Sequence, residues 1–120
     1  MRRARGVKVD RLRAEYLEAV ARYTQAASAL RAAMDEADDA LEVMRAHVTR
    51  GRPLADVLPS IRPAGVRNNL SDAADALERA RHAAQRVVYE ILVAEGLTMA
   101  EIGRTFGVSR SLVSRVIHQD

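Results

Sequence analysis

The sequence contains no cysteine and no tryptophan, and only one of its 120 residues is phenylalanine. The absence of cysteine excludes a disulfide scaffold and a thiolate zinc site. No apolar run approaches the roughly 20 residues that a membrane-spanning helix needs, and the basic N-terminus lacks the apolar stretch of a secretory signal. We therefore expect a cytoplasmic protein without a membrane partner.

Residues with the spacing of a catalytic or metal site are also missing. The histidines His47, His82 and His118 are far apart in the sequence, which does not match the ligand spacing of a metal site. There is no Gly-rich phosphate loop and no nucleophile next to a base, as an enzyme of the common classes would need. We expect neither enzymatic activity nor a cofactor.

The pattern of β-strands is absent as well. Hydrophobic residues make up 48% of the chain, and most of them are Ala, Val and Leu, without the alternation of period two that strands require. Small apolar residues suit closely packed helices. We predict an all-α fold, in which a long, coiled-coil-like helical hairpin precedes a C-terminal tri-helical helix-turn-helix.

Charge is distributed unevenly although the formal net charge is only +3. Residues 1–8 form a basic arm, and residues 35–42 carry acids without a base. This distribution is typical of a protein that meets nucleic acid at its ends. The arm either lies along phosphates or in a minor groove, or it is a disordered start. Because 18 of the 19 basic residues are Arg, and Ala is also abundant, a GC-rich genome is an equally good source of the Arg content.

Residues 9–50 predict one long amphipathic helix for dimerisation or partner binding. The segment has no Gly or Pro between Val9 and Val48. From Val20 onward its apolar residues recur in alternating steps of three and four, as in a helix that packs along another helix. Such a helix would be about 60 Å long, which is too long to bury its apolar face alone. The predicted stripe comprises Val9, Leu12, Tyr16, Val20, Tyr23, Ala27, Leu30, Met34, Ala37, Leu41, Met44 and Val48.

A connector at residues 51–67, rich in Pro and Gly, separates this helix from a second one at residues 68–95. Ser71 followed by acidic residues predicts its N-cap, with Asn68 or Asn69 as alternatives, and Gly96 predicts its end. The second helix would leave part of the first uncovered. A homodimer would cover the remainder, and a monomeric hairpin is the alternative.

The C-terminal segment, residues 84–119, has the start and stop signals of two short helices. Thr98 with Glu101 forms a capping box, and Gly107 supplies the left-handed residue that ends the first helix. Ser109 then caps the last helix. Two helices joined by so short a turn cross steeply, and Gly103 would allow the second to approach the first.

The run Met99–Arg115 resembles the helix-turn-helix of sigma-factor region 4 and of serine-recombinase DNA-binding domains, which share the pattern hxxAEIAxxxGVSRxTVxR. Here it reads MAEIGRTFGVSRSLVSR. Gly103 replaces the usual Ala, which would loosen the helix. Leu112 replaces a Thr that in relatives often touches a phosphate. The resemblance implies that the last helix enters the major groove of double-stranded DNA.

A helical wheel of the last helix places its apolar residues on one side and its polar residues on the other. Arg110 and Arg115 could each form a bidentate pair with guanine, and Arg104 on the preceding helix could contact a phosphate. His118 is as good a partner for the helix dipole as for DNA. The predicted DNA-binding residues are Arg104, Ser109, Arg110, Ser111, Ser114, Arg115, His118 and Gln119.

These features predict a dimeric, nucleoid-associated transcriptional regulator that recognises an inverted repeat, with half-sites about 34 Å or a multiple apart. The alternative is a protein-interaction module whose long helix docks onto RNA polymerase, a sigma factor or another regulator. A recombinase would need a catalytic domain before the motif, and a sigma factor a promoter-melting domain, and neither is visible in the sequence.

Overall fold

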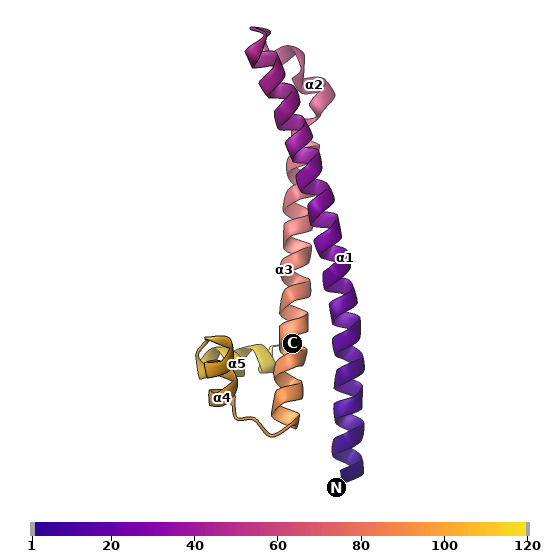
Figure 1. The fold of residues 1–120 in the computed structure, drawn as a ribbon, viewed down its shortest axis with the longest axis vertical. Helices are drawn as coiled ribbons and strands as arrows, with labels where there is room; N and C mark the ends of the chain where they lie inside the picture. The colour runs from indigo at the N-terminus through magenta and orange to yellow at the C-terminus, as the bar shows by residue number, and fades with distance from the viewer. Residues whose placement is uncertain (1, 120) are drawn as a thin grey trace. The chain divides into compact units, whose positions relative to one another are not determined.

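The computed structural model describes the backbone of residues 2–119 and the side chains of residues 6–119, and this part of the chain is all-helical with no strand. The predicted fold class is confirmed at this level. None of the described helices is both long and apolar enough to cross a membrane. The elements, shown in Figure 1, are α1 (Arg2–Thr49), a 3-10 turn η1 (Leu54–Asp56), α2 (Leu58–Ile61), α3 (Pro63–Ala94), α4 (Met99–Phe106) and α5 (Arg110–His118).

Helix α1 is longer than predicted at its N-terminus. It begins at Arg2, so residues 2–8, which the sequence suggested as a separate basic arm, continue the helix; Met1 lies outside the described residues. No Gly or Pro after Gly6 interrupts the segment before Gly51, whose φ of +69° is a left-handed conformation suited to ending a helix.

Helix α3 begins earlier than predicted, and the prediction of an N-cap at Ser71, Asn68 or Asn69 is wrong. The helix starts at Pro63. Proline is favourable at the first helical position because its φ is already fixed near the helical value, and because the backbone N–H that it lacks would have no partner there. Arg62 precedes it with a φ of +58° and ends α2. Ser71 therefore lies inside the helix.

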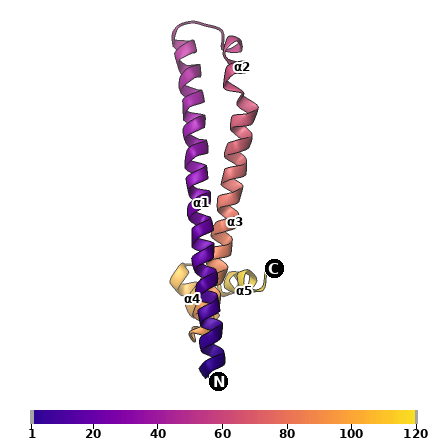
Figure 2. The same ribbon diagram turned by 90° about the vertical axis from the view of Figure 1, so that its right-hand side faces the viewer.

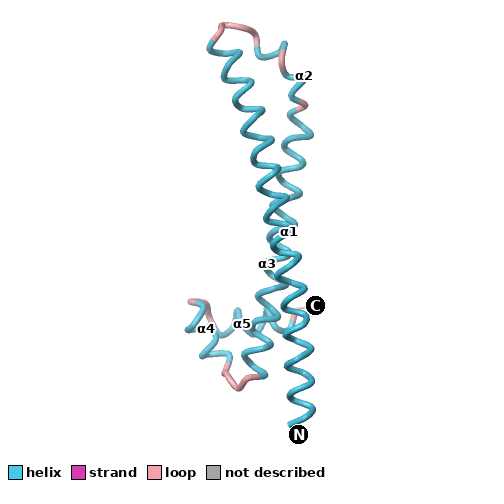
Figure 3. The backbone as a smooth tube through the Cα atoms, turned by 45° about the vertical axis from the view of Figure 1, so that its right-hand side comes forward, coloured by secondary structure: helices cyan, strands magenta, loops and turns pink. Residues whose placement is uncertain are grey.

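The chain divides into two compact units, one of residues 24–78 and one that combines residues 2–23 with 79–119. In the first unit, the C-terminal half of α1 and the start of α3 run side by side, joined by η1 and α2 (Figure 2). Figure 3 shows the pink loops of the connector between them. Val57 is buried in this connector, whereas Leu54 and Leu58 beside it are exposed.

The buried face of α1 in this unit differs from the predicted stripe. Met34, Leu41 and Val48 are exposed by 51%, 60% and 60%, whereas Ala33 is only 7% exposed. The three large residues therefore lie outside the intramolecular seam, where alanine lets neighbouring helices approach more closely than a longer side chain does. The inner seam consists of Leu30, Ala33, Ala37, Ala40 and Met44, all buried or half-buried.

The second unit has a core of large side chains where the end of α3 meets α4 and α5. Val88, Leu92 and Val108 pack around it, half-buried, as does Leu112. Leu12 of α1 is buried in the same unit. The fully or almost fully buried members of the core are Tyr89, Ile102, Val113 and Val116.

Candidate nucleic-acid interface

A reciprocal capping box fixes the start of α4, as the sequence predicted. The Thr98 hydroxyl accepts a hydrogen bond from the backbone N–H of Glu101, and the Glu101 carboxylate accepts one from the backbone N–H of Thr98, both at 3.1 Å. Two amides that the helix cannot satisfy thereby gain partners. Hydrogen bonding of the Glu101 carboxylate to the backbone and to the side chain of Thr98 lowers the pKa of Glu101, and the nearby charge of Arg104 lowers it further.

The turn between α4 and α5 depends on two glycines. Gly107 ends α4 with a φ of +70°, a conformation that costs glycine little. At Gly103 a Cβ atom would lie 2.7 Å from the carbonyl oxygen of Val108 and 3.3 Å from the backbone nitrogen of Arg110. Gly103 therefore does more than loosen the helix, because any other residue would force the start of α5 away from α4.

The inward side of α5 is held by the core and by its own N-cap. Val113 is fully buried and Val116 is 4% exposed, which fixes the rotation of the helix about its axis. The Ser109 hydroxyl accepts a hydrogen bond from the backbone N–H of Leu112 at 3.0 Å. Leu112 packs against the core. Its apolar side chain therefore contributes to the fold, at the position where the resembling families often have a Thr that contacts a phosphate.

Tyr89 is the core residue that the sequence analysis missed. It is fully buried, and its hydroxyl accepts a hydrogen bond from the Gln85 side chain at 2.7 Å. Its ring meets Phe106 edge to face, with centroids 5.3 Å apart. Phe106 remains 46% exposed. The available signal was the spacing from Tyr89 to Leu92, which places both on one face of α3.

Seven of the eight predicted DNA-binding residues are exposed, and Ser114 is half-buried. α5 thus presents a polar face that lies opposite the core, and Arg104 is exposed on α4. The exposed residues are Arg104, Ser109, Arg110, Ser111, Arg115, His118 and Gln119.

Local hydrogen bonds divide this set into residues with a structural task and residues free to bind. The Ser109 hydroxyl is used as the N-cap. His118 Nδ1 lies 2.7 Å from the carbonyl oxygen of Ser114, and since a carbonyl only accepts, the proton is on Nδ1. This arrangement favours the role of His118 at the helix end over DNA contact. The backbone carbonyl of Gln119 accepts a hydrogen bond from Arg86 at 3.4 Å, which leaves the side chain of Gln119 available.

Arg110 and Arg115 carry the positive charge of this face. Within the described part of the chain, no carboxylate forms an ion pair with either guanidinium. Both are therefore free to offer their N–H donors to an anionic partner. The described residues hold no cluster of three potential metal ligands, and the chemistry of this face is that of hydrogen-bond donors.

The chain was compared with protein families, curated proteins and solved structures. No family model, no curated protein and no solved structure matches it.

Proposed function

We propose that the protein is a sequence-specific, double-stranded DNA-binding protein that acts as a dimeric transcriptional regulator. In this proposal α4, the Gly107 turn and α5 form a helix-turn-helix, and α5 is its recognition helix. The observation that carries the proposal is the rotation of α5, which buries Val113 and Val116 and leaves Arg110, Ser111 and Arg115 exposed.

The dimensions of α5 support this role. Its nine residues form a rod about 13 Å long, and a B-DNA major groove about 12 Å wide admits such a helix. Ser111 and Ser114 are small, so that the helix can sit deep between the phosphate walls, whereas Arg110 near its N-terminus reaches toward base edges.

The two arginines support sequence recognition beyond simple charge attraction. An arginine can bind guanine O6 and N7 with two N–H donors, and each such pair gives about 1–3 kcal/mol of discrimination. Arg104 on α4 is suited to a phosphate, which positions the protein without reading sequence.

Substitution at Arg115 tests the proposal. DNA selected from a random pool by the wild-type protein serves as the specific probe. Arg115→Ala should weaken binding to it by about 5- to 150-fold, the equivalent of 1–3 kcal/mol, with less effect on unselected DNA. Fluorescence anisotropy titrations at fixed salt measure both affinities.

Two further variants separate base recognition from charge. Arg115→Lys keeps the charge but loses the bidentate geometry, and should therefore lose specificity while retaining binding to unselected DNA. Arg52→Ala removes an exposed arginine from the connector and should leave specificity unchanged. If Arg115→Ala binds the selected DNA as tightly as the wild-type protein, α5 is not the reading helix.

A further inference from the structure

An exposed apolar stripe follows α1 within the unit of residues 24–78. Met34, Leu41 and Val48 recur at intervals of seven residues and are exposed by 51%, 60% and 60%. A repeat of seven keeps them on one face of the helix. We call these three residues the outer stripe.

The outer stripe lies beside the inner seam, on a different part of the helix surface. The inner seam, with Ala33 almost fully buried, already faces inward in this unit. At 100° per residue, the mean direction of the outer stripe lies roughly 60° from that of the inner seam. α1 therefore has a second apolar face after its intramolecular packing is complete.

The companion helix has no equivalent face in this unit. Between Pro63 and Glu78, none of the described residues is an exposed large hydrophobic side chain. The other exposed large apolar residues of the unit are Val43 on another side of α1, and Leu54 and Leu58 in the connector. The outer stripe is thus the longest regular apolar surface that this unit presents to a partner.

The charges interleaved with the outer stripe indicate the partner. Asp38 and Arg45 fall between the apolar residues, so that positions 34, 38, 41, 45 and 48 follow steps of four and three, the spacing of a coiled-coil contact. We propose that this face binds a second copy of the same chain in antiparallel orientation, about a two-fold axis near Leu41.

Antiparallel pairing matches both the apolar and the charged positions. With the axis at Leu41, Met34 lies opposite the partner subunit's Val48. Asp38 lies level, to within about one residue or 1.5 Å of rise, with the partner subunit's Arg45. Parallel pairing would instead set each charge against its own copy, which is unfavourable. The apolar and charged positions of this face are therefore complementary to the same positions on a second copy that is related by a two-fold axis, as an isologous interface requires.

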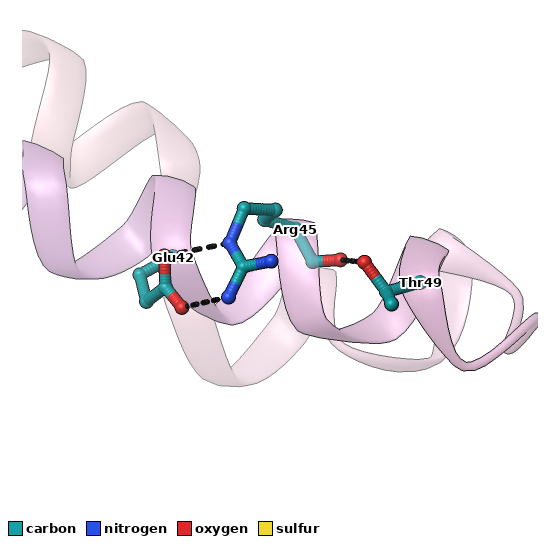
Figure 4. A network of polar contacts seen from close by, with 3 residues as sticks. All are labelled: Glu42, Arg45 and Thr49. Atoms are coloured by element: carbon teal, nitrogen blue, oxygen red, sulfur yellow. Dashed lines mark hydrogen bonds and ion pairs between the residues drawn. The ribbon is translucent and has the colours of Figure 1, made fainter.

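The conformation of Arg45 fits this contact. Its guanidinium is held by Glu42, with Nε 2.9 Å from the carboxylate, and the Thr49 hydroxyl donates to the Arg45 carbonyl (Figure 4). The Arg45 side chain remains 65% exposed. Glu42 thus restrains the arginine on the surface of α1, while its remaining N–H donors stay available to a partner carboxylate.

Sedimentation equilibrium of the full chain without DNA tests the association. We expect a dimer in the micromolar range, and Leu41→Glu should raise its dissociation constant at least about 30-fold because it buries charge at the axis. Val43→Glu is the matched control, since Val43 is also exposed on α1 but about 160° away from Leu41, and should leave the constant within about threefold. A wild-type monomer at 100 µM, about 100 times a micromolar dissociation constant, or equal effects of the two variants, would overturn the proposal.

Cysteine cross-linking tests the orientation, and the chain offers a clean background because it has no cysteine. In the antiparallel dimer Leu41→Cys should cross-link to itself through a short thiol-specific reagent. Met34→Cys should cross-link to Val48→Cys when the two variants are mixed, and neither should cross-link alone. If Met34→Cys and Val48→Cys each cross-link to themselves, the helices are parallel and the proposed register is wrong.

The association is independent of DNA binding. Loss of specificity in Arg115→Ala tests α5, whereas the sedimentation and cross-linking experiments contain no DNA and test α1. The recognition of DNA by α5 can therefore fail while the association stands, whereas a monomer would leave DNA binding in place and remove only the dimeric part of the proposed function. If the wild-type protein is monomeric and a different protein is captured through Leu41, the second-copy proposal fails and the alternative of a heterologous partner takes its place.

Discussion

The core around Ile102 and the helix pair of residues 24–78 differ in the side chains they bury. In the core, Tyr89, Ile102 and Val113 are completely buried. In the helix pair, the buried apolar residues are Ala33 and Val57, while Met34, Leu41 and Val48 stay exposed. Both regions are helical, yet only the core around Ile102 buries large apolar side chains of its helices, since Val57 lies in the connector.

This difference shows how each region obtains its stability. Burying a large apolar side chain gives about 1.5–3 kcal/mol, so the core around Ile102 can hold its short helices in place. Those helices are only eight and nine residues long, and helices of that length are marginal alone. Alanine contributes much less, so the longer helices of the pair depend more on their own backbone hydrogen bonds and on whatever covers the outer stripe.

The largest predicted effect compares one residue of each region. Ile102→Ala should lower the free energy of unfolding by about 2–5 kcal/mol, because it opens a cavity in a packed core. Val43→Ala in the helix pair should change it by no more than about 0.5 kcal/mol, since Val43 is exposed. Urea denaturation followed by circular dichroism measures both. A loss below about 1 kcal/mol at Ile102 would mean that this core is not tightly packed.

Two helical glycines are expected to respond to alanine with opposite signs. Gly103→Ala should destabilise the protein by about 1–2 kcal/mol, because overpacking against the carbonyl oxygen of Val108 costs about 1–3 kcal/mol and outweighs the gain in helix propensity. Gly65→Ala should stabilise it by about 0.5–1 kcal/mol, since a Cβ there has no atom within 4 Å.

The same denaturation experiment checks this pair. Stabilisation by Gly103→Ala would show that α5 can move away from α4 without cost. Loss of stability in Gly65→Ala would contradict the open space beside the start of α3.

A comparison of two hydroxyl residues tests where helices begin. Thr98→Ala should cost about 1 kcal/mol, because it removes the capping box of α4. Ser71→Ala should stabilise the protein slightly, by about 0.5 kcal/mol, because Ser71 lies inside α3, where alanine is the better helix former. If Ser71→Ala instead lost about 1 kcal/mol of stability, Ser71 would be the N-cap of the helix, as the sequence suggested. Thermal unfolding of both variants measures the difference.

The parts of the fold that sequence reasoning predicted correctly are those that depend on local chemistry. The capping box at Thr98, the left-handed Gly107 and the cap at Ser109 each need only a few neighbouring residues. The polar face of α5 followed from helical periodicity. The hydrogen bond between His118 Nδ1 and the Ser114 carbonyl did not, because it depends on a side-chain conformation that a helical wheel does not represent.

The parts that sequence reasoning missed depend on packing between distant segments. Two stripes of residues on the alanine-rich helix α1 follow the same alternating steps of three and four, and they differ by a small rotation about the helix axis. Because Met34 and Leu41 are more hydrophobic than alanine, the sequence pattern favoured the stripe that contains them. The close approach of the neighbouring helix instead places the stripe that contains Ala33 and Ala40 in the buried seam. The early start of α3 was missed because Pro63 lies in the segment that its Pro and Gly content predicts to be a connector, whereas proline is favourable at the first helical position.

The smallest predicted effect concerns two glutamates, one in each region, whose pKa values are lowered for different reasons. Hydrogen bonds with Thr98 lower the pKa of Glu101, whereas a hydrogen bond and the charge of Arg45 lower that of Glu42. A carboxylate with a lowered pKa stabilises the folded state above its ordinary pKa of about 4.3. This contribution is lost as the pH falls through the lower, folded-state pKa. Both residues therefore weaken the protein in the same direction under acid conditions.

Salt should separate the two causes. At about 1 M ionic strength the Debye length is about 3 Å, so the charge attraction that accompanies the hydrogen bond between Glu42 and Arg45 is weakened, while the local hydrogen bonds between Glu101 and Thr98 persist. Carboxyl carbon shifts followed by NMR titration should show the pKa of Glu42 returning toward its ordinary value, with that of Glu101 moving less. Glu101→Gln, which keeps a side-chain oxygen for the cap, should remove the contribution of Glu101 to acid sensitivity without unfolding α4. If salt shifts the pKa values of the two glutamates equally, the pKa of Glu101 is controlled by charge rather than by the capping hydrogen bonds.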